Sequence, residues 1–335
     1  MTIACGSQVV LCDMPIRLDT YTGCTHNCSY CFARRNREIE KVNPEASLVS
    51  LRRFINGERT QQTNWCDWRI PLHWGGMSDG FQPREAEGKA SLAVLEELVK
   101  TQYPVVISTK GRLIVEEPYL GLLAQANVVL QISLVHAELD AQEKGAPTAE
   151  ERVRWLPILA PKVKRLLVRC QPYVPGLAGG IIKDFLPRYR DAGVHGVTFE
   201  GFKGLKAFPG SEKVLGDNVF SVGVLKPDFL KLRDGCHANK LAFYSAENRL
   251  RSLGDSPNCC GTDGVPGFQG NSANLNHRAA DGSLIYTPAM KEVGTAQSFR
   301  TLWQTSVGGL TLATKSYAEV MELVRKTDTF RDAVK

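Results

Sequence analysis

Long apolar runs are missing from this sequence. No stretch reaches the roughly 20 apolar residues that a membrane-spanning helix needs. The first twenty residues, MTIACGSQVVLCDMPIRLDT, lack a basic start followed by a long apolar core. We therefore expect a cytoplasmic protein with no membrane partner, and the 43% apolar content is ordinary for a folded chain with a buried core.

A large charge excess is also missing. Lysine and arginine together number 41, aspartate and glutamate 35, and the formal net charge is +6. This excess suits an anionic partner, but the chain lacks the dense basic stripe of a dedicated nucleic-acid-binding domain. The charge therefore neither requires nor excludes nucleic acid.

Internal repeats and low-complexity linkers are absent as well, and apolar segments instead alternate with helix-like ones. Thr148 and Glu151 form a capping box that marks one helix start. Alternation of strands and helices predicts an α/β fold with a parallel sheet, either an open doubly wound sheet or a curved partial barrel. The predicted strands are residues 16–21, 70–74, 105–109, 128–134, 165–170 and 194–199, and the predicted helices are residues 47–55, 85–100, 116–126, 148–156 and 181–192.

This rhythm changes near residue 225. A helix is predicted at residues 227–234 and a strand at residues 241–245, before a stretch rich in glycine and asparagine. We therefore expect two parts, a first domain of residues 1–225 and a C-terminal substrate or cap region of residues 226–335.

The ten cysteines are scattered except for one group, in which three fall within eight residues. A disulfide framework is not expected in a reducing compartment, so this close spacing favours metal ligation. The group lies in YTGCTHNCSYCF and spaces Cys24, Cys28 and Cys31 as CxxxCxxC, directly after the first predicted strand. Thiolates suit the irons of a [4Fe–4S] cluster, and three of them leave one iron open to a ligand from outside the protein.

Two other kinds of site fit the same cysteines. A structural zinc ion normally takes a fourth protein ligand, which His26 would supply from inside the loop. A closed electron-transfer cluster would take its fourth thiolate from a distant cysteine such as Cys66. The number of nearby ligands favours the open cluster.

These residues resemble the signature of the radical S-adenosylmethionine (SAM) superfamily, CxxxCxΦC, with Tyr30 at the aromatic position. The segments MSDGFQPREAE, VVISTKGRLI and EKGAPTAEERVRWL are similar to the spore photoproduct lyase-like branch, whose members are also called DNA repair photolyases. The resemblance covers residues 15–200. It implies a partial (β/α)6 TIM-type barrel with a C-terminal extension and a radical SAM enzyme with lyase-type or isomerase-type chemistry.

The resemblance also implies roles for single residues. Cys24, Cys28 and Cys31 would hold the cluster, and Asp79 would accept the ammonium group of SAM, although Ser-Asp-Gly is equally typical of a turn. The implied SAM-binding residues are Tyr30, Gly75, Gly76, Ser78, Asp79, Ser133 and Gln171. The implied reaction is reductive cleavage of SAM to a 5′-deoxyadenosyl radical, with an electron from a low-potential donor such as a flavodoxin or ferredoxin.

The sequence departs from the lyase pattern at one position. Spore photoproduct lyases carry a hydrogen-donating cysteine before a Thr-Ser-Asp, where this sequence has Gly76 and Met77 before Ser78 and Asp79. We therefore expect hydrogen abstraction from a nucleobase or base adduct in DNA, with modification or isomerisation favoured over thymine-dimer repair. The alternatives are a radical SAM enzyme for a peptide or small molecule, and a non-catalytic iron–sulfur protein for electron transfer or redox sensing.

Cys236 and the adjacent Cys259 and Cys260 form a second group of cysteines. Three thiolates suit an auxiliary cluster or metal ion, and Cys259 or Cys260 would suit a catalytic hydrogen donor. The alternative is that these thiols pack as small apolar side chains.

Basic side chains recur near Arg34, near Arg52 and between Lys162 and Arg169. Guanidinium groups match phosphate geometry, which favours a DNA or nucleotide partner. Each group also falls on a predicted helix or loop face, where solvated charge is the ordinary outcome.

Overall fold

The computed structural model describes residues 3–5, 12–35, 38–58, 60, 63, 70–214 and 217–270. Cys66, one of the fourth ligands considered above, and residues 271–335 of the predicted C-terminal region lie outside them. No helix in the described ranges is long and apolar enough to cross a membrane.

The main sheet of the described chain has eight strands. They are, in their order across the sheet, β1 (Ile3–Cys5), β2 (Ile16–Leu18), β3 (Leu72–Trp74), β4 (Val105–Thr109), β5 (Val128–Ser133), β6 (Arg165–Tyr173), β7 (Gly196–Gly201) and β11 (Ala242–Ser245). β1 is antiparallel to β2, and every other neighbouring pair is parallel. The predicted fold class is confirmed, because this is an α/β chain whose parallel sheet forms a partial TIM-type barrel.

Both faces of the sheet are covered, since the side chains of each strand alternate between two cores. All five residues of β4 are buried. Val105 and Ile107 pack into the core shared with the helices, whereas Val106 packs inside the barrel with Val129. Burial on both faces explains why these strands read as continuous apolar runs in the sequence.

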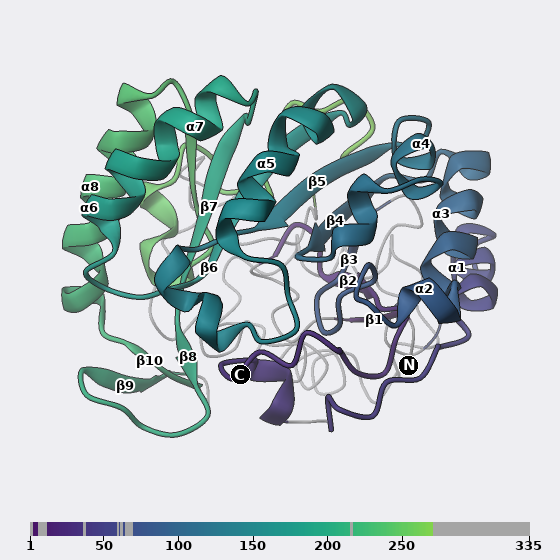
Figure 1. Cartoon of the computed structure of the whole chain (residues 1–335), viewed down its shortest axis with the longest axis horizontal. Coiled ribbons are helices and arrows are strands. Elements are labelled where there is room, and N and C mark those ends of the chain that lie inside the picture. Colours follow the sequence, from purple (N-terminus) through teal and green to yellow (C-terminus); the bar gives the residue numbers. More distant parts are fainter. Residues whose placement is uncertain are drawn as a thin grey trace, which may run out of the picture.

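Helices cover the outer side of the barrel. They are α1 (Ser47–Ile55), α2 (Glu85–Gly88), α3 (Ala90–Thr101), α4 (Tyr119–Leu123), α5 (Ala149–Leu159), α6 (Ala178–Gly180), α7 (Leu186–Asp191) and α8 (Val222–Ala238). Figure 1 shows an arc that runs from α1 and α3 over α5 to α7 and α8. α1 has its predicted bounds, and the capping box of Thr148 and Glu151 is present at the start of α5. The helix predicted at residues 85–100 is divided, because Lys89 adopts a left-handed conformation between α2 and α3.

The sheet continues beyond the predicted domain boundary. The strand expected at residues 241–245 is β11, and its Ala242 lies opposite Gly196 of β7 in a parallel ladder. α8 precedes β11, so the alternation of strand and helix continues. The main sheet therefore extends past residue 225, and the division of the chain into two parts stays a prediction.

A second, smaller sheet was not predicted from the sequence. This sheet begins just beyond the carboxyl end of β7 (Figure 1), and its three short strands are β8 (Lys203–Gly204), β9 (Ser211–Val214) and β10 (Asp217–Phe220). The rings of Phe208 and Phe220 pack against each other with centroids 4.8 Å apart. Strands of two and four residues are too short to produce a clear periodic pattern in the sequence.

Candidate cofactor site

The three-cysteine loop follows β2 at the carboxyl ends of the parallel strands. The backbone N–H of Cys24 donates to the carbonyl of Ile39 at 2.8 Å, and that of Cys31 donates to the carbonyl of Cys28 at 3.2 Å. Asn27 turns the loop with a φ of 49°, in the left-handed region that asparagine tolerates well. As a result all three thiols line one cavity.

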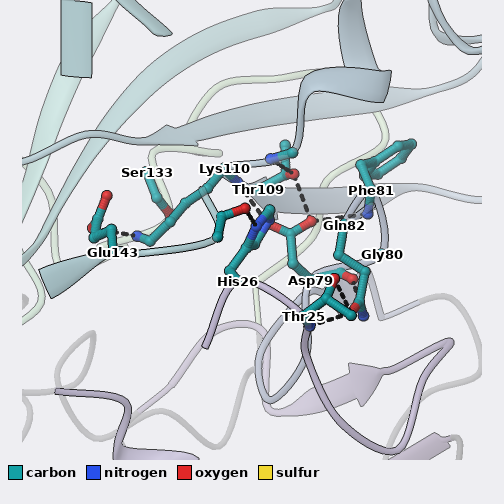
Figure 2. Close-up of polar contacts among 12 residues, drawn as sticks. Thr25, His26, Asp79, Gly80, Phe81, Gln82, Thr109, Lys110, Ser133 and Glu143 are labelled. Carbon is teal, nitrogen blue, oxygen red and sulfur yellow. Dashed lines mark hydrogen bonds and ion pairs between the residues drawn. The ribbon is translucent and has the colours of Figure 1, made fainter. Parts of the chain in front are cut away.

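Gln82 braces this loop from the segment after β3. Its Oε1 accepts the backbone N–H of Thr25 at 2.6 Å, and its Nε2 donates to the carbonyls of Gly23 at 3.0 Å and Asp79 at 2.8 Å (Figure 2). The side chain is fully buried, so these bonds replace its contacts with water. The sequence analysis did not single out Gln82, because nothing local distinguishes it from other residues of MSDGFQPREAE.

The carboxylate of Asp79 is surrounded by donors (Figure 2). Its Oδ1 accepts from the Phe81 backbone N–H at 2.8 Å and from Thr109 Oγ1 at 2.7 Å. Its Oδ2 accepts from the Lys110 backbone N–H at 2.6 Å and faces His26 Nε2 at 3.2 Å. Burial by itself would raise the pKa of Asp79, but the facing His26 and these donors outweigh it and lower the pKa. Protein groups thus occupy the lone-pair directions of the Asp79 carboxylate, and these contacts position the cysteine loop. The contact of Asp79 with the SAM ammonium group stays a prediction.

His26 is turned away from the position of a zinc ligand. Its Nδ1 lies 2.9 Å from the Gly145 carbonyl oxygen, and its Nε2 faces Asp79. Both ring nitrogens are therefore directed at protein groups, and the side chain is buried. The zinc alternative loses its fourth ligand in this conformation.

Glu143 joins the loop to the neighbouring strands. The Tyr30 hydroxyl donates to its carboxylate. Lys110 Nζ lies 3.3 Å from its Oε1, a contact that Figure 2 shows. Arg152 donates to the other carboxylate oxygen and, at 2.6 Å, to the carbonyl of Ser133. Burial by itself would raise the pKa of Glu143, but Lys110 and Arg152 outweigh it and lower the pKa to about 2. Glu143 and Arg152 both lie in the quoted segment EKGAPTAEERVRWL, but Tyr30 and Lys110, the other partners of Glu143, are 113 and 33 residues away, so no role could be assigned to it from the sequence.

One cavity collects every residue predicted for the cluster and for SAM. These lining residues are Cys24, Cys28, Tyr30, Cys31, Gly75, Gly76, Ser78, Asp79, Ser133 and Gln171. Gly75 has a φ of 94°, and a Cβ there would lie 2.1 Å from the carbonyl oxygen of Ser108, so only glycine fits. The separate contacts of these residues with SAM stay predictions.

The same cavity has side chains that the sequence analysis did not assign to it. Among them are Phe32, His73, Arg169, Phe202 and Lys203. Arg169 donates to Gln131 at 3.1 Å, to Glu200 at 3.3 Å and to Gln171, and Lys203 also bonds Glu200. Arg169 and Lys203 therefore share the carboxylate of Glu200.

The three thiols of the loop suit an iron–sulfur cluster. Burial raises the pKa of Cys24 to about 12 and that of Cys28 to about 11, so the free thiols keep their protons at neutral pH. A bound iron replaces that proton and compensates the thiolate charge that burial disfavours. Among the described residues, no three histidine, cysteine, aspartate or glutamate side chains converge on the position of a single metal ion. A cluster does not require such convergence, because each thiolate binds a different iron. The cavity in front of the loop leaves room for the predicted outside ligand.

Cys259 and Cys260, the predicted catalytic thiols, are not in the wall of this cavity. Their segment fills the barrel interior nearer the amino ends of the strands, where Cys260 packs with Val129. Gln131 Nε2 donates to the carbonyl of Cys260 at 3.2 Å, and Thr198 Oγ1 donates to that of Cys259 at 2.9 Å. The structure does not bring either thiol to the other predicted site residues.

Cys236 is separated from both of these cysteines. It lies on α8 and packs into the outer core, whereas Cys260 belongs to the core inside the barrel. The described structure therefore does not form the auxiliary site predicted at Cys236, Cys259 and Cys260, because the sheet stands between its ligands.

The basic groups noted in the sequence are largely engaged by the protein itself. Arg34 pairs with Glu40, and Arg52 Nη2 lies 2.8 Å from a carboxylate oxygen of Glu97. Arg165 donates at 2.8 Å to two backbone carbonyls of the segment inside the barrel. These pairs weaken the argument that the basic groups bind phosphate.

Comparison with solved structures identifies the fold. A spore photoproduct lyase with bound SAM and dinucleoside spore photoproduct matches with a TM-score of 0.55 at 14% identity, over 69% of this chain and 76% of the lyase. This chain has a radical SAM, spore photoproduct lyase-like fold. SuiB of Streptococcus suis, solved with bound SAM, shares the radical SAM fold with a TM-score of 0.50 at 14% identity, over 70% of this chain and 51% of SuiB. The fold that the three-cysteine motif implied is confirmed.

Sequence comparison adds relatives without an assigned function. Uncharacterized proteins of Mycobacterium bovis and Mycobacterium tuberculosis are 27% identical to the chain over 205 residues. The match covers 56% of this chain and 59% of those proteins, so the chain spans only part of their length. No family profile matches the chain.

Proposed function

We propose that this protein is a radical SAM enzyme that acts on a nucleobase or base adduct in DNA. The observation that carries the proposal is the convergence of the three loop thiols and the SAM-motif residues on one cavity of a spore photoproduct lyase-like fold. Cys24, Cys28 and Cys31 would hold a [4Fe–4S] cluster, which would supply the electron for cleavage of SAM to a 5′-deoxyadenosyl radical and hence for hydrogen abstraction from the substrate. A flavodoxin or ferredoxin would deliver that electron.

The protein itself positions the cysteine loop and the SAM-motif segment relative to each other. Gln82 and Asp79 fix the loop against the segment after β3, and Glu143 fixes it against α5. Gly75 lets the β3 loop approach the backbone of β4 closely. These contacts hold the thiols and the SAM-motif segment in one fixed arrangement, as a reactive radical requires.

Two aromatic side chains support a nucleobase substrate. Phe32 and Phe202 both line the cavity, and Phe32 is 43% exposed beside Cys31. Aromatic rings at a site mouth suit base stacking, which every base can provide. Arg169 and Lys203 also line the cavity and could donate hydrogen bonds to carbonyl oxygens of a base.

The position of the missing donor cysteine favours modification over dimer repair. A Cβ at Gly76 would lie 3.1 Å from Cδ of Arg17. Arg17 would therefore have to shift by a few tenths of an ångström to admit a cysteine at position 76. Without that cysteine, dimer repair would need a hydrogen donor from elsewhere.

Anaerobic reconstitution followed by reduction with SAM tests the proposal. Duplex DNA, single-stranded DNA and free nucleosides are each supplied in deuterated form, and 5′-deoxyadenosine and its deuterium content are measured. We expect deuterium transfer from a nucleic acid substrate and no cleavage by the Cys24→Ser variant. Absence of 5′-deoxyadenosine under every condition would leave the non-catalytic iron–sulfur alternative. Deuterium transfer from a peptide or small molecule, with none from any nucleic acid, would contradict the substrate assignment.

A further inference from the structure

His73 lines the cavity, and the hydrogen bonds of its neighbours determine which of its ring nitrogens carries the hydrogen. It lies on β3, and its Nε2 is 2.8 Å from Ser108 Oγ of β4. Its Nδ1 has no hydrogen-bond partner among the described residues. Which nitrogen carries the ring hydrogen depends on the direction of the hydrogen bond to Ser108.

Gln131 fixes that direction. Its Nε2 donates to the carbonyl of Cys260, so its Oε1 faces the opposite way and accepts from Arg169 Nη1 at 3.1 Å. A carbonyl oxygen only accepts and a guanidinium only donates, so the amide cannot be reversed. The Ser108 hydroxyl lies 2.8 Å from Oε1 and donates its one hydrogen there.

The hydroxyl of Ser108 can then only accept from His73. Nε2 therefore carries the ring hydrogen, and Nδ1 is left as a bare lone pair at the cavity wall. Burial, with the charges of Arg169 and Arg17, lowers the pKa of His73 to about 3, so the ring is neutral at neutral pH. The chain of hydrogen bonds also gives the segment inside the barrel a role, because the Cys260 carbonyl anchors one end of it.

Arg169 supplies donors on the same wall. A guanidinium has five N–H groups, and three of them bond Gln131, Gln171 and Glu200. The others have no partner among the described residues. His73 and Arg169 thus both line the cavity and are linked through Ser108 and Gln131.

We propose that His73 Nδ1 accepts a hydrogen bond from a ring N–H of the substrate base, while Arg169 donates to the carbonyl oxygen beside it. This pair recognises an imide or lactam edge such as that of thymine and disfavours an edge without a ring N–H. The inference rests on the proposed function, because it names the class of base that the cavity takes.

The tautomer is tested without any substrate. Nitrogen-15 NMR of the ring nitrogens, with labelled histidine in the reconstituted, oxidised protein, should show His73 as the Nε2–H form at neutral pH. The ring should also stay neutral at pH values where an exposed histidine is protonated. The Ser108→Ala variant should lose this fixed tautomer. An Nδ1–H tautomer, or an ordinary histidine titration, overturns the inference whatever the substrate is.

Recognition is tested by anaerobic binding of a thymine-containing oligonucleotide and its N3-methylated analogue, in the presence of SAM and without reductant. We expect N3-methylation to weaken binding to the unchanged protein about tenfold. His73→Leu should bind both oligonucleotides equally, and His73→Asn should regain discrimination, because its amide oxygen reaches the Nδ1 position. His195, an exposed histidine outside the cavity, provides the matched control variant His195→Leu, which should discriminate like the unchanged protein.

The possible failures are separable. Equal binding of the two oligonucleotides by the unchanged protein overturns the inference and leaves the proposed function intact, as does discrimination that survives in His73→Leu. Binding of neither oligonucleotide, together with no deuterium transfer from any nucleic acid, contradicts the proposed function and removes the base-recognition role with it. The NMR result still decides the tautomer in that case.

Discussion

The two ends of the barrel interior each contain cysteines, and they use them differently. At the mouth, Cys24, Cys28 and Cys31 share one loop, and their thiols line a cavity. On the floor, a segment of residues 256–268 fills the barrel, and Cys259 and Cys260 offer their backbone carbonyls to Thr198 and Gln131. The two groups therefore differ in what the structure does with them, because the loop thiols line a cavity whereas the floor cysteines are held through their backbone carbonyls.

The electrostatics of the two regions differ in the same way. At the mouth, burial raises the pKa of Cys24 and Cys28, so the thiolate state depends on a bound metal. On the floor, the hydrogen bond from the Cys260 thiol and the guanidinium of Arg251 lower the pKa of Cys259. On the floor, protein groups themselves therefore favour the thiolate of Cys259.

The largest expected effect is the loss of the cluster. Replacing any one of Cys24, Cys28 and Cys31 with alanine should remove most of the iron and abolish SAM cleavage, because no other thiol shares their loop. Iron and sulfide analysis after anaerobic reconstitution measures this. Cys260→Ala on the floor is the matched control and should keep the full iron content. Loss of iron from that control would contradict the prediction that only the cysteines at the mouth hold the cluster.

Glu143→Gln should give the next largest effect. It leaves Lys110 and Arg152 without their buried carboxylate, at a cost of about 3–5 kcal/mol of unfolding free energy at neutral pH. The pKa of Glu143 falls from 4.5 to about 2 on folding, so its contribution is present above pH 4.5 and disappears as the pH falls from there towards 2. Denaturant unfolding at a series of pH values should show the variant and the unchanged protein converging in that window. Glu138→Gln, at a side chain that is 69% exposed, is the control, and a gap for Glu143→Gln that does not change with pH would contradict the prediction.

Gly75→Ala tests how closely the mouth is packed. Its Cβ would meet the Ser108 carbonyl at 2.1 Å in a backbone with a φ of 94°, and we expect a loss of about 3 kcal/mol in unfolding free energy. Gly176 has a similar φ of 96°, but a Cβ there would meet no atom within 4 Å beyond its chain neighbours, so Gly176→Ala should cost only about 1 kcal/mol. Thermal unfolding of both variants compares them. Equal losses would mean that the clash at the mouth is relieved at little cost.

Thr198→Val is expected to have the smallest effect. It removes the hydroxyl that donates to the Cys259 carbonyl, and leaving that acceptor without a partner should cost about 1–2 kcal/mol. Iron content should not change, because the floor does not hold the cluster. A drop in iron content alongside normal folding would show that the floor supports the metal centre.

Much of the site could be predicted because its signals are local. The spacing of Cys24, Cys28 and Cys31 and the segment around Gly75 each lie within a few residues, and each falls after a strand that the apolar pattern reveals. Gln82, Glu143 and His73 could not be found in that way. Their partners lie 35 residues away for the His73 bond to Ser108, 57 for the Gln82 bond to Thr25, and 113 for the Glu143 bond to Tyr30.

The second cysteine group shows that nearness in the sequence does not by itself bring two side chains together. Cys236 and Cys260 are near each other in the chain, but α8 places one outside the sheet and the floor segment places the other inside it. The side of the sheet on which each segment lies, rather than its spacing in the sequence, decides which cysteines can meet.

The sequence by itself determined the alternation of strands and helices and the loop that presents three thiols, since periodicity and ligand spacing are properties of short segments. Only the tertiary structure decided that Cys259 and Cys260 lie outside the cavity wall and that His73 lines the cavity with its Nε2 next to Ser108. Those outcomes depend on hydrogen bonds between strands, whose partners are chosen when the sheet curves and closes around its interior.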